Sequence, residues 1–114
     1  MGAFRGEGKR SQFFATYLVG VYHNNKLYPV CKVGSGFTDA QLEEYTYLFN
    51  SLIIDKKPED YEIPRTLKIE NYIKPTHVFK VVCQDLTRSP LYKLYYEEDS
   101  GGISLRFPVF QQIR

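Results

Sequence analysis

Residues 102–114 read Gly-Ile-Ser-Leu-Arg-Phe-Pro-Val-Phe-Gln-Gln-Ile-Arg, and this stretch decides how the chain folds. Apolar residues recur at every second position over 103–109 with polar residues between them, a period typical of a half-buried strand. Pro108 removes one backbone donor, so we expect an edge strand that is bulged or bent at that point. Such a bend would direct the neighbouring side chains of Arg106 and Phe107 outwards.

The composition predicts one small, β-rich domain. Of the 114 residues, 43% are apolar and 16% are aromatic, which is enough for a single core with many strand-forming side chains. The net charge of +2 is too small to predict nucleic-acid binding, so any basic surface has to be local. Cys31 and Cys83 each lie in an apolar run and are expected to be buried free thiols; we expect no metal site. Without a run of about 20 apolar residues or a secretory signal, we expect a soluble intracellular domain with no membrane partner.

The first half of the chain predicts a hairpin followed by a helix. Residues 13–22 and 27–33 are rich in aromatic and β-branched side chains, and 23–26 is a turn sequence between them. Thr38 and Gln41 have the spacing of a capping box, which marks a helix start. Helical spacing of the apolar residues that follow predicts about four turns with one buried face, made of Leu42, Tyr45, Phe49 and Leu52.

The second half is less regular. Residues 55–75 have no period and are interpreted as a long connection. Residues 77–85 alternate again and predict a strand. After it we expect a turn at 87–90, a short extended piece at 91–96 and an acidic loop at 97–102 before the final strand.

Three blocks of this sequence, taken together, resemble the C-terminal oligonucleotide-binding (OB) domain of ATP-dependent DNA ligases, in particular the replicative type of eukaryotes and archaea. The blocks are Gly-Glu-Gly-Lys-Arg at 6–10, Val-Cys-Lys-Val-Gly-Ser-Gly-Phe at 30–37 and Gly-Ile-Ser-Leu-Arg-Phe-Pro at 102–108, in the family's order and at about its spacing. The resemblance covers essentially the whole chain. It implies an all-β fold with one helix, a five-stranded, partly open Greek-key barrel. Because residues 2–6 match the end of the family's first strand, we expect that strand to be truncated and residues 1–114 to form a single domain of a larger, multidomain ligase.

The resemblance implies the function of a whole enzyme to which this chain contributes. Ligases of this family carry AMP from ATP to a lysine and then to the 5′-phosphate of a nick, where the 3′-hydroxyl displaces it; they act in DNA replication and repair. The chain would be the DNA-binding domain, with ATP and Mg²⁺ as cofactors of the full enzyme and neither bound by this chain alone. It contains no Lys-x-Asp-Gly and no phosphate-cradling glycine loop, and His23 and His77 read as ordinary surface residues. We therefore expect no catalytic residue here and no activity from the chain by itself.

Five residues are candidates for binding. Lys9 and Arg10 lie in a glycine-punctuated loop, where they would contact the DNA backbone or be merely solvated. Arg106 and Phe107 match the family's Arg-Phe pair, which lies in the minor groove beside the nick; the alternative is that Phe107 is a core residue and Arg106 a solvated charge. Arg114 matches the first residue of the Arg-x-Asp-Lys motif that aligns the ATP triphosphate, and so is a partial nucleotide-binding match.

The chain departs from the family at Val109 and Gln112, where arginine is common, so a full pyrophosphate-binding role is not expected of this strand. The implied partners are nicked duplex DNA and the nucleotidyltransferase domain of the same protein, with a sliding clamp as a further candidate. The implied location is nuclear in a eukaryote and cytoplasmic in an archaeon or virus. Two rival interpretations remain, a freestanding OB module for single-stranded nucleic acid and the OB domain of an RNA ligase or capping enzyme.

Overall fold

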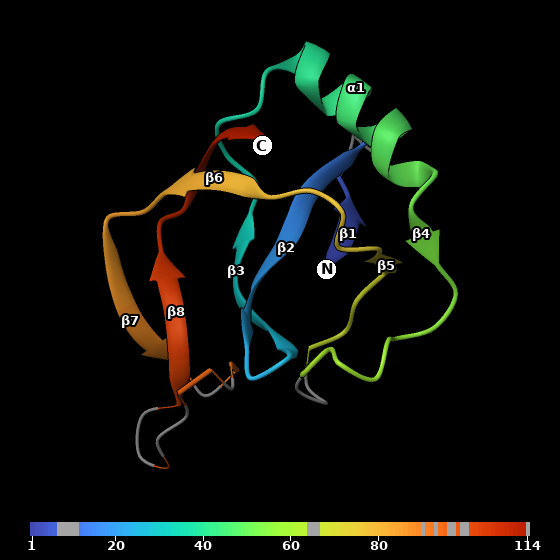
Figure 1. Cartoon of the computed structure of the whole chain (residues 1–114). Coiled ribbons are helices and arrows are strands. Elements are labelled where there is room, and N and C mark those ends of the chain that lie inside the picture. Colours follow the sequence, from blue (N-terminus) through green and yellow to red (C-terminus); the bar gives the residue numbers. More distant parts are fainter. Residues whose placement is uncertain are drawn as a thin grey trace.

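The computed structural model describes residues 1–6, 12–63, 67–89, 91–92, 94–95, 98 and 101–113. Its regular elements are small strands with one helix between them. In chain order they are β1 (Gly2–Arg5), β2 (Phe14–His23), β3 (Lys26–Val33), α1 (Asp39–Asn50), β4 (Ile53–Ile54), β5 (Asn71–Ile73), β6 (Phe79–Val82), β7 (Asp85–Ser89), β8 (Gly102–Arg106) and β9 (Val109–Ile113) (Figure 1).

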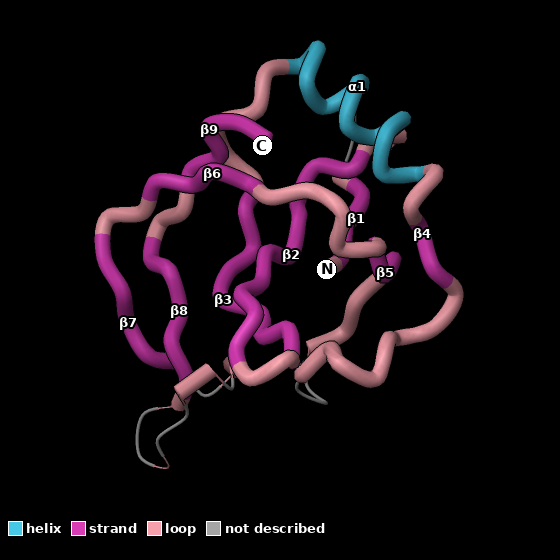
Figure 2. The backbone as a smooth tube through the Cα atoms, viewed as in Figure 1, coloured by secondary structure: helices cyan, strands magenta, loops and turns pink. Residues whose placement is uncertain are grey.

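The strands form one antiparallel sheet and two antiparallel ribbons. The sheet has the order β3-β2-β1-β5-β4, and the ribbons pair β6 with β9 and β7 with β8. Figure 2 shows that the chain bends sharply between β6 and β7 and again between β8 and β9, so each ribbon strand is half of one long bent strand. One backbone hydrogen bond, from the Phe110 amide to the Ser35 carbonyl, connects β9 to the segment after β3, and the described strands form no closed barrel. This is an OB-fold-like β domain.

The hairpin and the helix have the local chemistry that the sequence predicts. Asn24 and Asn25, between β2 and β3, both have positive φ, 51° and 65°, as a two-residue turn matched to strand twist requires. The Thr38 hydroxyl accepts a hydrogen bond of 3.1 Å from the Gln41 amide, and the Thr38 amide donates one of 3.0 Å to the Gln41 side chain. The turn and the capping box are confirmed, but the helix has 12 residues, little more than three turns, and Leu52, expected on its buried face, lies beyond its end at Asn50.

Helix α1 lies across one end of the sheet and covers an aromatic core (Figure 1). Thr46 joins the helix to β2, because its hydroxyl accepts from the Phe14 amide at 2.9 Å and donates to the Leu42 carbonyl at 2.6 Å. Beneath the helix the ring centroids of neighbouring aromatic side chains lie 4.3 to 6.5 Å apart. The rings belong to Tyr17, Phe37, Phe49, Phe79 and Phe110. Five of the eighteen aromatic residues of the chain thus form this part of the core.

Three sequence interpretations are wrong in detail. Residues 85–89, expected to end in a turn, form strand β7 along their whole length, paired with β8. The connection expected over 55–75 contains β5, which pairs with β1 and β4. The described residues of the extended piece expected at 91–96 are turns and irregular backbone, and Tyr95 has a φ of 50°. In the first two cases a partner distant in sequence supplies the hydrogen bonds, and single-segment periodicity does not report such partners.

Candidate nucleic-acid interface

The candidate interface lies at the bend between β8 and β9. Phe107 has a φ of 52°, a left-handed conformation that costs a non-glycine residue about 1–2 kcal/mol. Burial of the ring does not offset this cost, because 58% of the residue is exposed. The bend expected from Pro108 is therefore present, and it directs Phe107 out of the core. The core interpretation of Phe107 does not hold.

Arg106 and Phe107 form one projecting unit. The guanidinium carbon of Arg106 lies 5.0 Å from the centroid of the Phe107 ring, within the range of a cation–π contact. The Arg106 carbonyl accepts a hydrogen bond of 3.0 Å from the Gln84 amide, where β6 bends into β7. Both bends are thus tied together directly behind the projecting pair. The unit offers a positive charge and a flat apolar face on a fixed backbone.

Exposed apolar side chains lie on the strands next to the two bends. Val82 and Val109 are paired across β6 and β9 and are both exposed, by 48% and 41%. Leu86, on β7, is also exposed, but its register partner is Leu105, so it lies on the ribbon face opposite to Arg106. Alternation predicted that Val109 would be buried, and this prediction is wrong because the bend restarts the period.

The segment after β3 anchors the bend from behind. The Phe110 amide donates a hydrogen bond of 2.8 Å to the Ser35 carbonyl. Gly36 has a φ of 92°, and a β-carbon there would overlap the carbonyl oxygen of Phe110 and lie 2.9 Å from its nitrogen. Only glycine gives both this φ and this close approach without strain. Sequence reasoning used Gly36 only as part of the block at 30–37 and missed its contact with β9.

The other predicted binding residues, Lys9, Arg10 and Arg114, lie outside the described residues. The backbone on either side of residues 7–11 is described: the Gly6 amide donates to the Phe13 carbonyl at 3.1 Å. Beside it the Arg5 guanidinium lies 4.9 Å from the centroid of the Phe14 ring and donates to the Gln12 carbonyl at 2.9 Å. Arg5 is a cation that sequence reasoning did not select; its place directly before the glycine-rich block was the available signal.

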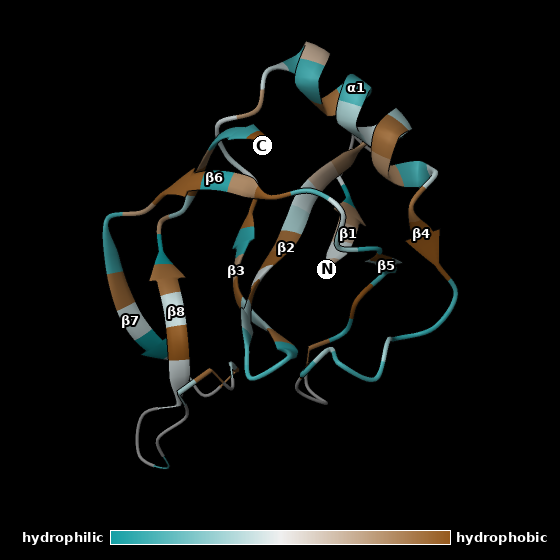
Figure 3. Cartoon of the chain, in the orientation of Figure 1, coloured by the Kyte–Doolittle hydropathy of each residue, from teal (hydrophilic) through white to brown (hydrophobic). Residues whose placement is uncertain are grey.

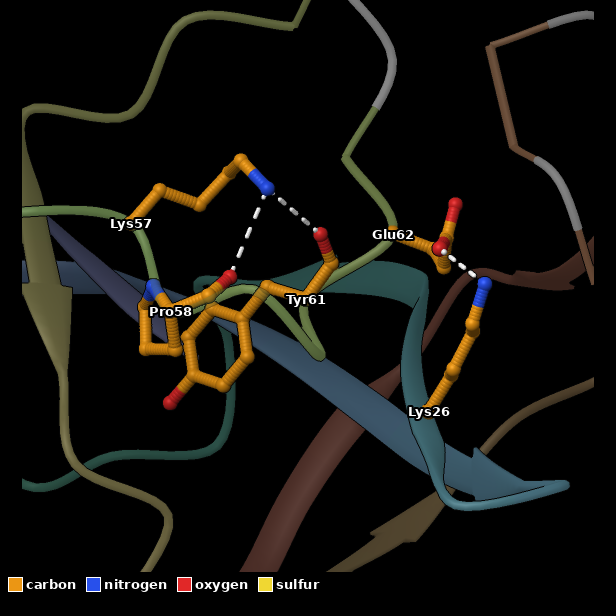
Figure 4. Close-up of polar contacts among 5 residues, drawn as sticks. All are labelled: Lys26, Lys57, Pro58, Tyr61 and Glu62. Carbon is orange, nitrogen blue, oxygen red and sulfur yellow. Dashed lines mark hydrogen bonds and ion pairs between the residues drawn. The ribbon is translucent and has the colours of Figure 1, made fainter.

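Two lysines are used inside the fold (Figure 4). Lys57 donates to the carbonyl oxygens of Tyr61, at 3.0 Å, and Pro58, at 3.4 Å. Lys26 forms an ion pair of 3.0 Å with Glu62, and this hydrogen bond raises the pKa of the Lys26 ammonium. The Lys26–Glu62 pair joins the hairpin to the connection, whereas Lys57 bonds within the connection itself. Because both ammonium groups already have partners, they are poor candidates for binding a ligand.

The titratable core groups are structural. Burial raises the pKa of the Cys31 thiol to about 12, with a smaller contribution from Cys83, so Cys31 stays protonated. Burial likewise raises the pKa of Tyr61 to about 12, and its hydroxyl donates to the Ile73 carbonyl at 2.6 Å. Within the described ranges, His, Cys, Asp and Glu side chains form no group of three that would hold a metal ion. Over the same part of the chain, no helix has the length and apolar character needed to cross a bilayer.

The domain has the OB-fold-like architecture of a small, open β barrel, with an exposed Arg-Phe unit at a strand bend. Comparison with known proteins then gives the family. Residues 10–114 match the family model described as the ATP-dependent DNA ligase C-terminal region. The chain belongs to this family.

Individual relatives agree with the family match. The chain is 33% identical to DNA ligase 1 of Schizosaccharomyces pombe over its whole length. It is 35% identical to the DNA ligase of Sulfolobus acidocaldarius and 37% identical to that of Hyperthermus butylicus, each over 96% of the chain. It spans 16%, 19% and 18% of these three proteins, so it corresponds to less than a fifth of each relative.

Proposed function

We propose that this chain is the single, DNA-contacting C-terminal domain of a larger ligase that seals nicks in duplex DNA, and that Arg106 and Phe107 enter the minor groove at the nick. One observation carries the proposal: Phe107 keeps a left-handed backbone while its ring is exposed beside a guanidinium. An apolar side chain inserted into the minor groove unstacks and kinks the duplex, and an arginine is drawn to the negative potential there. Strained backbone is retained where the projecting side chain has a use.

The remaining parts of the enzyme complete the proposal. The adenylated lysine, ATP and Mg²⁺ are assigned to a nucleotidyltransferase domain of the same protein, because the described residues do not fit these groups. Val109, Gln111 and Gln112, exposed on β9, are uncharged and offer a triphosphate no cation. Arg114, which matches the family's motif, is proposed to contribute the only part of that motif this chain contains. When bound in the full enzyme, ATP supplies the AMP that activates the 5′-phosphate.

The wider setting is also proposed from the family. Lys9 and Arg10 would contact the phosphate backbone, and the whole enzyme would act in replication or repair, with a sliding clamp as a candidate partner. Its place would be the nucleus in a eukaryote and the cytoplasm in an archaeon or a virus. These assignments rest on relatives in both eukaryotes and archaea.

The test is a binding comparison with this chain and three DNAs: a nicked duplex, the intact duplex and the single strand. We expect the nicked duplex to bind best and Phe107→Ala to weaken that binding about tenfold or more, the scale of lost unstacking energy. Tyr47→Ala is the matched control, because Tyr47 is 86% exposed on α1, away from the bend. A preference for the single strand, or equal losses in both variants, would contradict the proposal and favour a freestanding single-strand-binding module.

A further inference from the structure

The β7–β8 ribbon has two chemically different faces. Leu105 packs against the core cluster around Phe110, so the residues that alternate with it on β8 point away from that cluster. Figure 3 shows this alternation as brown and pale bands along β8. The outward residues are Ser104 and Arg106, and their register partners on β7 are Thr87 and Asp85. The face turned away from that cluster therefore carries two half-buried hydroxyls side by side, next to the guanidinium of the proposed minor-groove unit, although on β7 the residues of the other face, Leu86 and Arg88, are the more exposed.

The hydroxyls of Thr87 and Ser104 are available for a ligand. Both residues are only partly exposed, and neither hydroxyl has a hydrogen-bond partner among the described residues. By contrast, the hydroxyl of Ser89, at the far end of the same strand, accepts from the Leu91 amide at 3.2 Å. Side chains directly opposite in an antiparallel pair have β-carbons about 5 Å apart, so both hydroxyls can reach one anionic oxygen group. Each hydroxyl can donate one hydrogen bond to it.

Two charged side chains share this face, Arg106 and its register partner Asp85. Arg106 is exposed, and no carboxylate of the described part of the chain lies within ion-pair distance of its guanidinium, which leaves the guanidinium open to a ligand. One carboxylate oxygen of Asp85 accepts from the Leu86 amide at 2.7 Å, so the donors toward an anion on this face are the guanidinium and the hydroxyl pair. The hydroxyl pair follows Arg106 at the next outward position along the ribbon, about 6.7 Å away. A positive group and a pair of neutral donors thus stand in sequence on one surface.

We infer that Thr87 and Ser104 together bind one phosphate of the DNA backbone, next to the position that Arg106 reaches. They are positioning residues: backbone contacts carry no sequence information but fix the register of a protein on a duplex. With the ribbon held on that phosphate, Phe107 meets the duplex at one step and does not slide along the groove. This inference rests on the proposed function, because it takes the Arg106–Phe107 unit to lie in the minor groove.

The test is a double-mutant cycle between protein and DNA. Phosphates on both sides of the nick are replaced one at a time by neutral methylphosphonate, and binding is measured for the chain and for Thr87→Val/Ser104→Ala. We expect one phosphate whose neutralisation weakens binding to the unaltered chain about tenfold, the scale of hydrogen bonds to a charged group. The double variant should bind the all-phosphate nick about tenfold more weakly and be indifferent to neutralisation at that one position.

Controls separate this site from folding and from the proposed function. Thr87→Ser keeps a hydroxyl at this position, so its DNA binding should remain sensitive to neutralisation of that phosphate. Thr16→Val removes a Thr hydroxyl from β2 and should bind the series of methylphosphonate duplexes as the unaltered chain does. If no phosphate couples to the hydroxyl pair while Phe107→Ala still weakens nick binding, the phosphate site is wrong and the proposed function stands. If the unaltered chain shows no preference for the nick, the proposed function fails and this inference fails with it.

Discussion

The backbone amide of Phe110 donates to the carbonyl of Ser35, and this 2.8 Å hydrogen bond ties β9 to the segment that follows β3. The bond forms only because Gly36, the next residue, lets the two backbones approach. The proposed DNA-contacting bend at Phe107 is three residues from this anchor. Its geometry therefore depends on a glycine about seventy positions earlier in the chain.

Gly36→Ala should destabilise the domain by about 1–3 kcal/mol, because alanine at a φ of 92° is strained and its β-carbon meets the Phe110 backbone. Urea denaturation measures the loss. Gly34→Ala is the control: φ at Gly34 is not in the left-handed region, and the nearest atom to a new β-carbon is the Thr16 hydroxyl at 3.1 Å. Equal losses at the two positions would remove the special role of Gly36.

Phe107→Ala should leave the thermal midpoint nearly unchanged, since an exposed side chain contributes within about 0.5 kcal/mol. Phe107→Gly should raise the free energy of unfolding by about 1 kcal/mol by relieving the left-handed φ. Phe110→Ala, in the core, should lower the free energy of unfolding by about 3–5 kcal/mol.

In the full enzyme, we expect Phe107→Ala to impair nick binding and sealing while self-adenylation continues. A large drop in midpoint, with adenylation and sealing lost in parallel, would show that Phe107 supports the fold instead.

Lys9→Ala/Arg10→Ala should flatten the salt dependence of duplex binding. Each neutralised phosphate contributes about −0.9 to the slope of log K against log salt. The slope measured for the double variant should therefore be smaller in magnitude by up to about two units. Lys26→Ala is the matched control, because this lysine is already paired with Glu62. An unchanged slope in the double variant would indicate that Lys9 and Arg10 are simply solvated.

Incubation of this chain with ATP and Mg²⁺ should give no covalent AMP adduct, because we assign the adenylated lysine to another domain. Intact-protein mass spectrometry detects the adduct as one added AMP. The full-length protein should gain that mass under the same conditions. An adduct on this chain would overturn the proposed division of labour between the domains.

Stability should fall as the pH rises above about 8.5, the ordinary pKa of a cysteine in an unfolded chain. Burial raises the pKa of Cys31 to about 12, so between these values the unfolded state has lost a proton that the folded state keeps. Native protein then binds more protons than unfolded protein, and the free energy of unfolding declines by up to about 1.4 kcal/mol per pH unit. Denaturation in reductant from pH 8 to 11 should show a shallower decline in Cys31→Ala. Val33→Ala is the control: it creates a cavity in the same core and should lower stability at every pH, without changing the slope of the free energy of unfolding against pH.

Elements whose information is local could be predicted from the sequence alone. The Thr38–Gln41 capping box and the turn at Asn24 and Asn25 are each set by contacts within a few residues. The three sequence blocks likewise indicated the family that the match over residues 10–114 shows. Pro108 was sufficient to predict a bend, because a residue without an N–H cannot continue the ladder.

The side chains exposed on each side of that bend depend on long-range contacts. Alternation assigned Phe107 and Val109 to the core, yet both are exposed, because the left-handed backbone at Phe107 resets the period. Residues 87–90 read as a turn in sequence, yet residues 87–89 belong to β7 because β8, more than ten residues away, supplies their hydrogen bonds. The juxtaposition of Thr87 with Ser104, and of Gly36 with Phe110, arises in the same way. Hydrogen-bond pairing and close backbone approach are properties of two segments at once, and neither segment's own sequence records its partner.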